Sequence, residues 1–138
     1  MSEKHVVVVP CSGIGKTYGT VGREAAYELA EELRPGCAEV VALSLLVGDE
    51  QTRAQVQSAP AITIDGCKLA CASKMVTESG GQVAYEANVL DTFRRHRHLK
   101  PKGIAELNEE GQELARQMAL ELAEAADKIV GEQEVKDA

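Results

Sequence analysis

The sequence predicts a single α/β domain with a four-stranded, mostly parallel sheet and helices on both faces. Three observations predict it. Residues 5–9 are dominated by a run of valines, the pattern of a strand buried on both faces. Short apolar segments alternate with helical patterns along the chain, which is typical of parallel strands joined by right-handed crossovers. The length of 138 residues fits one domain over residues 1–138.

The first half of the chain contains two clear strand–helix units. Pro10 ends the first strand, and a glycine-rich loop leads into a helix over 20–33, whose apolar residues recur at helical spacing. A second strand is expected at 39–45. Gly48 and Asp49 then open a short polar helix that reaches Gln57.

The second half repeats the pattern and closes with a long helix. We expect a third strand at 61–64, a helix from about residue 67 to 79 and a fourth strand at 82–89. The last helix is expected over 105–130, with residues 131–138 as a frayed tail. Its buried stripe comprises Leu107, Gly111, Leu114, Met118, Leu122, Ala125 and Ile129.

The preferred strand order is 2-1-3-4, which makes the first and third strands neighbours. In open α/β sheets, sites form beyond the carboxyl ends of the strands at such a switch point.

Composition excludes several classes of function. The net charge of −7 and the scarcity of aromatic residues argue against nucleic acid and anionic membranes as partners. No apolar run approaches the ~20 residues of a membrane span, and no cleavage signature follows Met1, so the expected location is the cytoplasm. Thiols stay reduced there, so the four cysteines suggest metal ligands or reactive thiols before disulfides.

Three of these cysteines are expected at one edge of the sheet. Cys11 follows the first strand and Cys67 follows the third, and neighbouring strands lie ~4.8 Å apart. Cys71 comes one helical turn after Cys67. Cys37 precedes the second strand, so we expect it at the opposite edge and without a role. The alternative is that the cysteines are small buried apolar residues.

The surroundings of these thiols favour negative charge. Cys67 and Cys71 are predicted in the first turn of a helix, where the dipole stabilises thiolates, and Lys16, Lys68 and Lys74 add positive charge. Asp65 is expected to cap that helix, with a ligand role as the alternative.

The loop after Cys11 is a candidate site for an anionic ligand. Its residues are Ser12, Gly13, Gly15, Lys16 and Thr17. The loop lacks the first glycine of a P-loop, but its amide groups could hold an anion or a thiolate. The alternative is that its glycines only allow a tight turn.

The segment 94–102 is strongly basic in an otherwise acidic chain. It follows the fourth strand, so it is expected at the same edge as the thiols. It could cover an anionic ligand or contact a partner, and His96 or His98 could complete a metal shell. A solvated run of charge is the simpler interpretation.

Two motifs together resemble a known family. Residues 10–16 with 19–24 resemble the start of the DGC-domain family, and Ile64–Cys67 followed by Cys71, Ala72 and Lys74 resembles the motif that names it. The resemblance covers roughly residues 5 to 90. The family is described as having four cysteines that bind zinc.

The resemblance implies a zinc cofactor held by Cys11, Cys67 and Cys71, with Asp65 and Lys74 beside it. The fourth family cysteine falls near the end of the second strand, where this chain reads Val41-Ala42-Leu43-Ser44. A site with three thiolates is more open than one with four, and open sites exchange metal or bind a ligand. The resemblance therefore favours metal or ligand sensing, delivery or regulation.

Two other functions stay open. One is a thiol-based redox or sulfur-transfer enzyme that uses Cys11, Cys67 and Cys71. The other is a phosphocysteine carrier, because the first half is also similar to phosphocysteine subunits of sugar phosphotransferase systems, with Cys11 as acceptor. The alanine-rich face of the last helix packs on the sheet or supports a homodimer.

Overall fold

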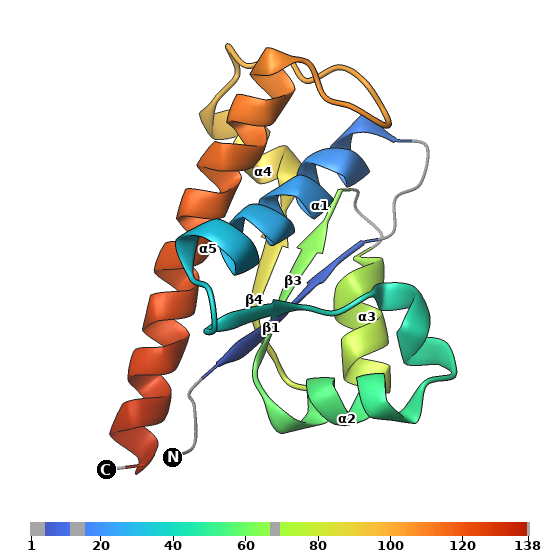
Figure 1. Ribbon diagram of the computed structural model, residues 1–138, viewed down its shortest axis with the longest axis vertical. Coiled ribbons are helices and arrows are strands. Elements are labelled where there is room, and N and C mark those ends of the chain that lie inside the picture. The colour runs from blue at the N-terminus through green and yellow to red at the C-terminus, as the bar shows by residue number, and fades with distance from the viewer. Residues whose placement is uncertain (1–4, 12–15, 67–69, 138) are drawn as a thin grey trace.

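The computed structural model describes residues 5–11, 16–66 and 70–137, and it confirms the predicted sheet. Within those residues the sheet has four strands in the order β2-β1-β3-β4, and every pair of neighbours is parallel (Figure 1). The strands are β1 (Val6–Pro10), β2 (Ala38–Val40), β3 (Ala61–Asp65) and β4 (Val83–Asn88).

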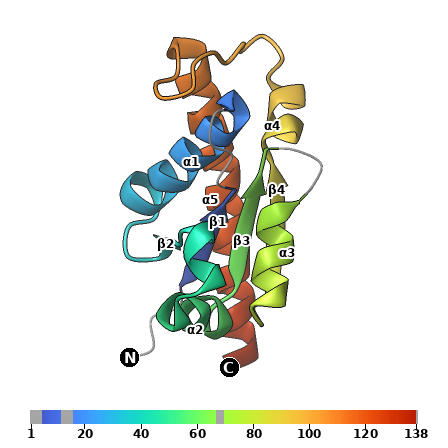
Figure 2. The ribbon, with the colours of Figure 1, turned by 90° about the vertical axis from the view of Figure 1, so that its right-hand side faces the viewer.

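Helices cover both faces of the sheet. One layer contains α1 (Thr17–Glu28), its π-helical extension η1 (Leu29–Leu33), α4 (Val89–Arg95) and α5 (Glu109–Asp137). The other contains the 3₁₀ turn η2 (Leu43–Val47), α2 (Glu50–Ser58) and α3 (Cys71–Glu78). Figure 2 shows α1 and α3 on opposite sides of the strands.

The valine run of β1 supplies both hydrophobic cores. Every residue of β1 is buried, and successive side chains of a strand point to opposite faces. Val6 and Val8 pack with α1 and α5, whereas Val7 and Val9 pack with α2 and α3. A central parallel strand needs apolar residues at every position because neither of its faces meets water.

The second strand is shorter than predicted. The expected strand over 39–45 is wrong beyond Val40, because the chain turns into η2. This turn buries Leu46 completely against the α2–α3 side while Leu45 and Val47 stay exposed. The apolar run was therefore divided between a short strand and a helical turn.

The ends of the last helix also differ from the prediction. The side chain of Asn108 accepts hydrogen bonds from the amides of Lys102 and Gly111, and so ends the preceding loop. The helix α5 therefore begins at Glu109 and not near Ala105. The predicted end near Val130 is wrong, because α5 runs to Asp137. Fraying of residues 131–138 in solution stays a prediction.

The alanine-rich face of α5 packs inside the domain. Ala115, Ala119, Ala123 and Ala126 are all buried in the core shared with α1. Small side chains let the two helices approach closely, and this face is therefore not free for a second chain.

None of the helices in the described residues is both long and apolar enough to span a bilayer.

The contact between α1 and β3 is close at Gly22. A Cβ atom placed on Gly22 would lie 3.0 Å from Cγ2 of Ile64 and 3.4 Å from Cγ2 of Val89. Protein interiors are packed too densely for such an atom to enter without displacement. The glycine therefore sets how closely the helix lies on the strand that leads to the predicted site.

Replacing Gly22 with alanine tests this contact. We expect the free energy of unfolding to fall by about 1–2 kcal/mol, because overpacking outweighs the helix propensity gained from alanine. Urea unfolding measures the change. Gly131→Ala in α5 is the control: nothing lies within 4 Å of its Cβ position, so it should raise stability by up to about 1 kcal/mol. Equal effects of the two variants would contradict the close contact.

Candidate functional site

The end of β1 is joined directly to the end of β3. The amide of Cys11 donates a hydrogen bond to the carbonyl of Ile64, with an N···O distance of 2.7 Å. Pro10 pairs with Ile64 in the register of the two strands, so Cys11 and Asp65 leave the sheet at the same edge (Figure 1). The thiol of Cys11 is half-buried there. The predicted position of Cys11 at the carboxyl edge is confirmed.

The segment after β3 lies against the start of α1. A Cβ atom on Gly66 would come within 3.3 Å of the backbone of Tyr18 and Gly19. A side chain at this position would force the facing backbone to shift by a few tenths of an ångström. The first turn of α1 and the chain that enters Cys67 are therefore in contact at the carboxyl edge.

Cys71 occupies the first position of α3. Ala70, which precedes it, has the left-handed backbone conformation with φ +52°, and a right-handed helix cannot continue through such a residue. The expected helix start near residue 67 and the relation of Cys67 to Cys71 fall outside the described residues, so they stay predictions. Lys68, Ser12, Gly13 and Gly15 also lie outside the described part of the chain.

Asp65 caps α3, as predicted. Its Oδ1 atom accepts a hydrogen bond of 2.9 Å from the amide of Ala72. The side chain is only 3% exposed. Burial raises the pKa of Asp65 above its ordinary value, and the bond from Ala72 together with the nearby amide and hydroxyl of Ser73 offsets this only in part.

This cap changes one sequence-based expectation. The amides at the start of α3 were expected to stabilise thiolates through the helix dipole. One of them, that of Ala72, bonds to the carboxylate of Asp65 instead. A carboxylate engaged in this way serves the helix and is not offered to a ligand.

The family of the chain follows from a comparison with known proteins. The family model of the DGC domain matches residues 7–118. The chain belongs to the DGC-domain family. No curated protein and no solved structure matches it. The matched region of the DGC domain contains Cys11, Cys67, Cys71 and the carboxyl edge, and it ends within α5.

A metal cluster is not formed by the described part of the DGC domain alone. No group of three or more His, Cys, Asp or Glu side chains among the described residues is arranged to hold a metal ion. Cys67 is outside that part of the chain, so the meeting of three thiols stays a prediction.

The predicted anion-binding residues are placed only in part. Lys16 is exposed and extended just before α1, and Thr17 is the first residue of that helix. Lys74 is exposed on α3. Their roles toward a ligand stay predictions.

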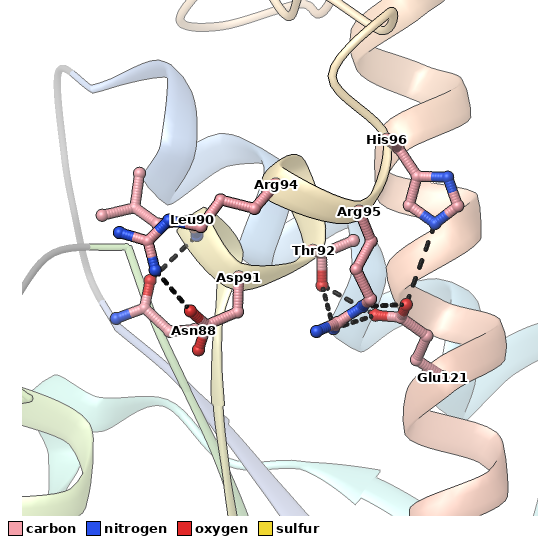
Figure 3. Close-up of polar contacts among 8 residues, drawn as sticks. All are labelled: Asn88, Leu90, Asp91, Thr92, Arg94, Arg95, His96 and Glu121. Atoms are coloured by element: carbon pink, nitrogen blue, oxygen red, sulfur yellow. Dashed lines mark hydrogen bonds and ion pairs between the residues drawn. The ribbon is translucent and has the colours of Figure 1, made fainter.

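The basic segment 94–102 turns part of its charge toward the protein. Arg94 pairs with Asp91 at 2.9 Å, and Arg95 makes two hydrogen bonds of 2.8 Å to the carboxylate of Glu121 in α5. Figure 3 shows Arg95 directed toward α5 and Arg94 on the other side of α4. Arg95 joins α4 to α5, whereas Arg94 pairs within α4. Both charges have partners within the protein, which weakens the interpretation of the segment as an anion lid.

The two candidate histidines lie at the end of α4. The Nε2 atom of His96 is 3.8 Å from Glu121 (Figure 3). The ring of His96 also contacts the ring of His98. A role for either residue as an extra metal ligand stays a prediction.

Sequence reasoning missed Glu121. It accepts hydrogen bonds from Arg95 and from the buried hydroxyl of Thr92, and it faces His96. Burial alone would raise the pKa of Glu121, but these hydrogen bonds and the positive charge of Arg95 outweigh burial and lower it. Its position on the helix facing α4, far along the chain from Arg95, gave no signal in the sequence.

Cys37 lies at the opposite edge, as predicted. Its carbonyl accepts a hydrogen bond from the amide of Val6 at the start of β1. Burial raises the pKa of its thiol, with a smaller contribution from the charge of Asp127. Cys37 is thus separated from Cys11 by the length of a strand.

The pH dependence of stability tests the contacts of Glu121. A lowered native pKa adds stability above the unfolded value of about 4.3, and this stability is lost as pH falls through the native pKa. Glu121→Gln should therefore cost about 1 kcal/mol at neutral pH and lose less stability than wild type on acidification.

Urea unfolding between neutral pH and about pH 3 measures this difference. Glu124→Gln removes the same charge from an exposed position of α5 and is the control. A wild-type curve that runs parallel to the Glu121→Gln curve would contradict the role of Glu121.

Proposed function

We propose that this DGC domain binds a thiophilic metal ion, Zn²⁺ in the first instance, for metal sensing, delivery or regulation. The ligands are the thiolates of Cys11, Cys67 and Cys71 at the carboxyl edge of the sheet. The observation that carries the proposal is the bond between the amide of Cys11 and the carbonyl of Ile64. This bond holds Cys11 next to β3. Cys67, the second ligand, follows two residues after the end of that strand.

The chemistry of the available donors fits zinc. Thiolate sulfur is a preferred ligand of Zn²⁺. The nearby carboxylate of Asp65 is engaged with the amide of Ala72, so the proposed donors are the three thiolates. Cys71 is half-buried at the start of α3, which agrees with a ligand for a metal ion that enters and leaves the site.

A set of three thiolates suggests an exchangeable site. Structural zinc sites are closed by four protein ligands, whereas an open position allows binding and release. The region where the family carries a further cysteine is occupied here by the end of β2 and the start of η2, without a thiol. The fourth position is left for water, a histidine or a ligand from outside, which supports sensing or delivery over a structural role.

The occupied amide of Ala72 favours metal binding over a thiol enzyme. A nucleophilic cysteine at a helix start depends on free backbone amides and positive charge to form its thiolate. In α3 the Asp65 carboxylate already accepts from the amide of Ala72. A bound cation would supply the positive charge that a thiolate next to a carboxylate requires.

Metal content tests the proposal. Protein purified without chelator should carry about one zinc per chain, because three thiolates bind Zn²⁺ tightly at neutral pH. Elemental analysis should show that Cys11→Ser, Cys67→Ser and Cys71→Ser each lose most of it. Acidification should release the metal, since protons compete for the ligands.

Cys37→Ser is the matched control, because it removes a thiol from the opposite edge and should keep the zinc. Folded wild-type protein that is free of metal and takes up no added Zn²⁺ would overturn the proposal.

A further inference from the structure

Three buried polar side chains lie where β3 meets the start of α3. The hydroxyls of Thr63 in β3 and Ser73 in α3 lie 2.7 Å apart and form a hydrogen bond. The Oδ1 atom of Asp65, at the end of the same strand, accepts a hydrogen bond from the amide of Ala72, which precedes Ser73. Thr63 is fully buried, and Ser73 and Asp65 are 6% and 3% exposed.

The bond between the two hydroxyls gives each of them a partner. A hydroxyl can both donate and accept, so either Thr63 or Ser73 can be the donor. Buried polar groups require such a partner. Removal of one hydroxyl would break this bond between the strand and the helix.

This arrangement connects the residues after Cys71 to a central strand of the sheet. Thr63 sits in β3 between its partners Val9 in β1 and Glu86 in β4. Asp65 in turn holds the amide of Ala72, the residue that follows Cys71. The first turn of α3 is therefore tied to the sheet on the side of the predicted metal site.

Ala70, the residue before Cys71, has an unusual backbone conformation, which indicates that the position of Cys71 is tightly constrained. Ala70 has φ +52° and ψ +43°, which a residue with a side chain adopts at a cost of about 1 kcal/mol or more. Such a conformation persists only where the surrounding structure enforces it. The cap by Asp65 enforces it by fixing where the helix starts.

We propose that Ser73 and Thr63 are positioning residues that act together with Asp65 to place Cys71 for metal binding. The inference rests on the proposed metal site and adds residues that contact no metal themselves. Groups that orient metal ligands from behind typically change affinity 10- to 100-fold when they are removed.

Zinc affinity tests this inference. Thr63→Val removes a hydroxyl and keeps the shape and the β-branched side chain that a strand favours. We expect it to weaken Zn²⁺ binding at least ~10-fold, in competition with a chelating dye, and Ser73→Ala to do the same. The charge-transfer spectrum of bound Co²⁺ should change as the thiolate at Cys71 is displaced.

Two matched controls separate positioning from general damage. Thr63→Ser retains the hydroxyl and should restore affinity to within about twofold of wild type. Thr77→Val removes a hydroxyl from the same helix that bonds only to the carbonyl of Ser73, and it should leave affinity unchanged. Zinc affinity of Thr63→Val and Ser73→Ala equal to that of wild type would refute the role. Where Ser73→Ala fails to fold, Thr63→Val decides.

A second measurement keeps this inference separate from the metal site itself. In metal-free protein that carries Cys71 as its single cysteine, the rate of alkylation by iodoacetamide reports the mobility and exposure of that thiol. Ser73→Ala and Thr63→Val should raise the rate several-fold, and Thr77→Val should not. If wild type binds no zinc, the proposed function fails. Separately, equal alkylation rates in wild type and all variants would reject the positioning role of Ser73 and Thr63.

Discussion

The pairing of β1 with β3 is the constraint on which the site depends. Two segments far apart in the sequence end side by side because the carbonyl of Ile64 accepts the amide of Cys11. The parallel direction of the pair brings both exits to one edge, and the helices that follow then start there. A different neighbour for β1 would separate Cys11 from Asp65 and from α3 altogether.

Close backbone contacts and buried polar groups refine that placement. Gly22 lets α1 lie directly on Ile64, and Gly66 lets the segment after β3 touch the start of α1. On the other face, Asp65 determines where α3 begins and so where Cys71 stands. Interfaces packed this closely do not deform gradually. The cysteine-bearing segments therefore emerge from a rigid frame.

Charged contacts join α4, which follows β4 at the carboxyl edge, to α5. Glu121 of α5 gathers Arg95, Thr92 and His96 from α4 and the turn that follows it (Figure 3). This contact gives part of the basic segment a partner within a chain of net charge −7. Part of the positive charge is structural, because it docks α4 against the long C-terminal helix.

The sequence by itself predicted the sheet and the edges at which Cys11 and Cys37 lie. Four successive valines in β1 indicate burial on both faces, as at the centre of a parallel sheet. The strand order was a preferred choice rather than a consequence of this pattern; it is confirmed, and it places Cys11 at the carboxyl edge. Local signals also predicted Asp49 as a helix start and Asp65 as a cap.

Only the tertiary structure decided the contacts between distant segments. The left-handed conformation of Ala70 comes from where Asp65 holds α3, and no local preference of alanine indicates it. The partnership of Glu121 with Arg95 and the bond between Thr63 and Ser73 likewise join residues on different elements. Periodicity reports which face of an element is buried, but the partner across an interface is set by how the elements pack.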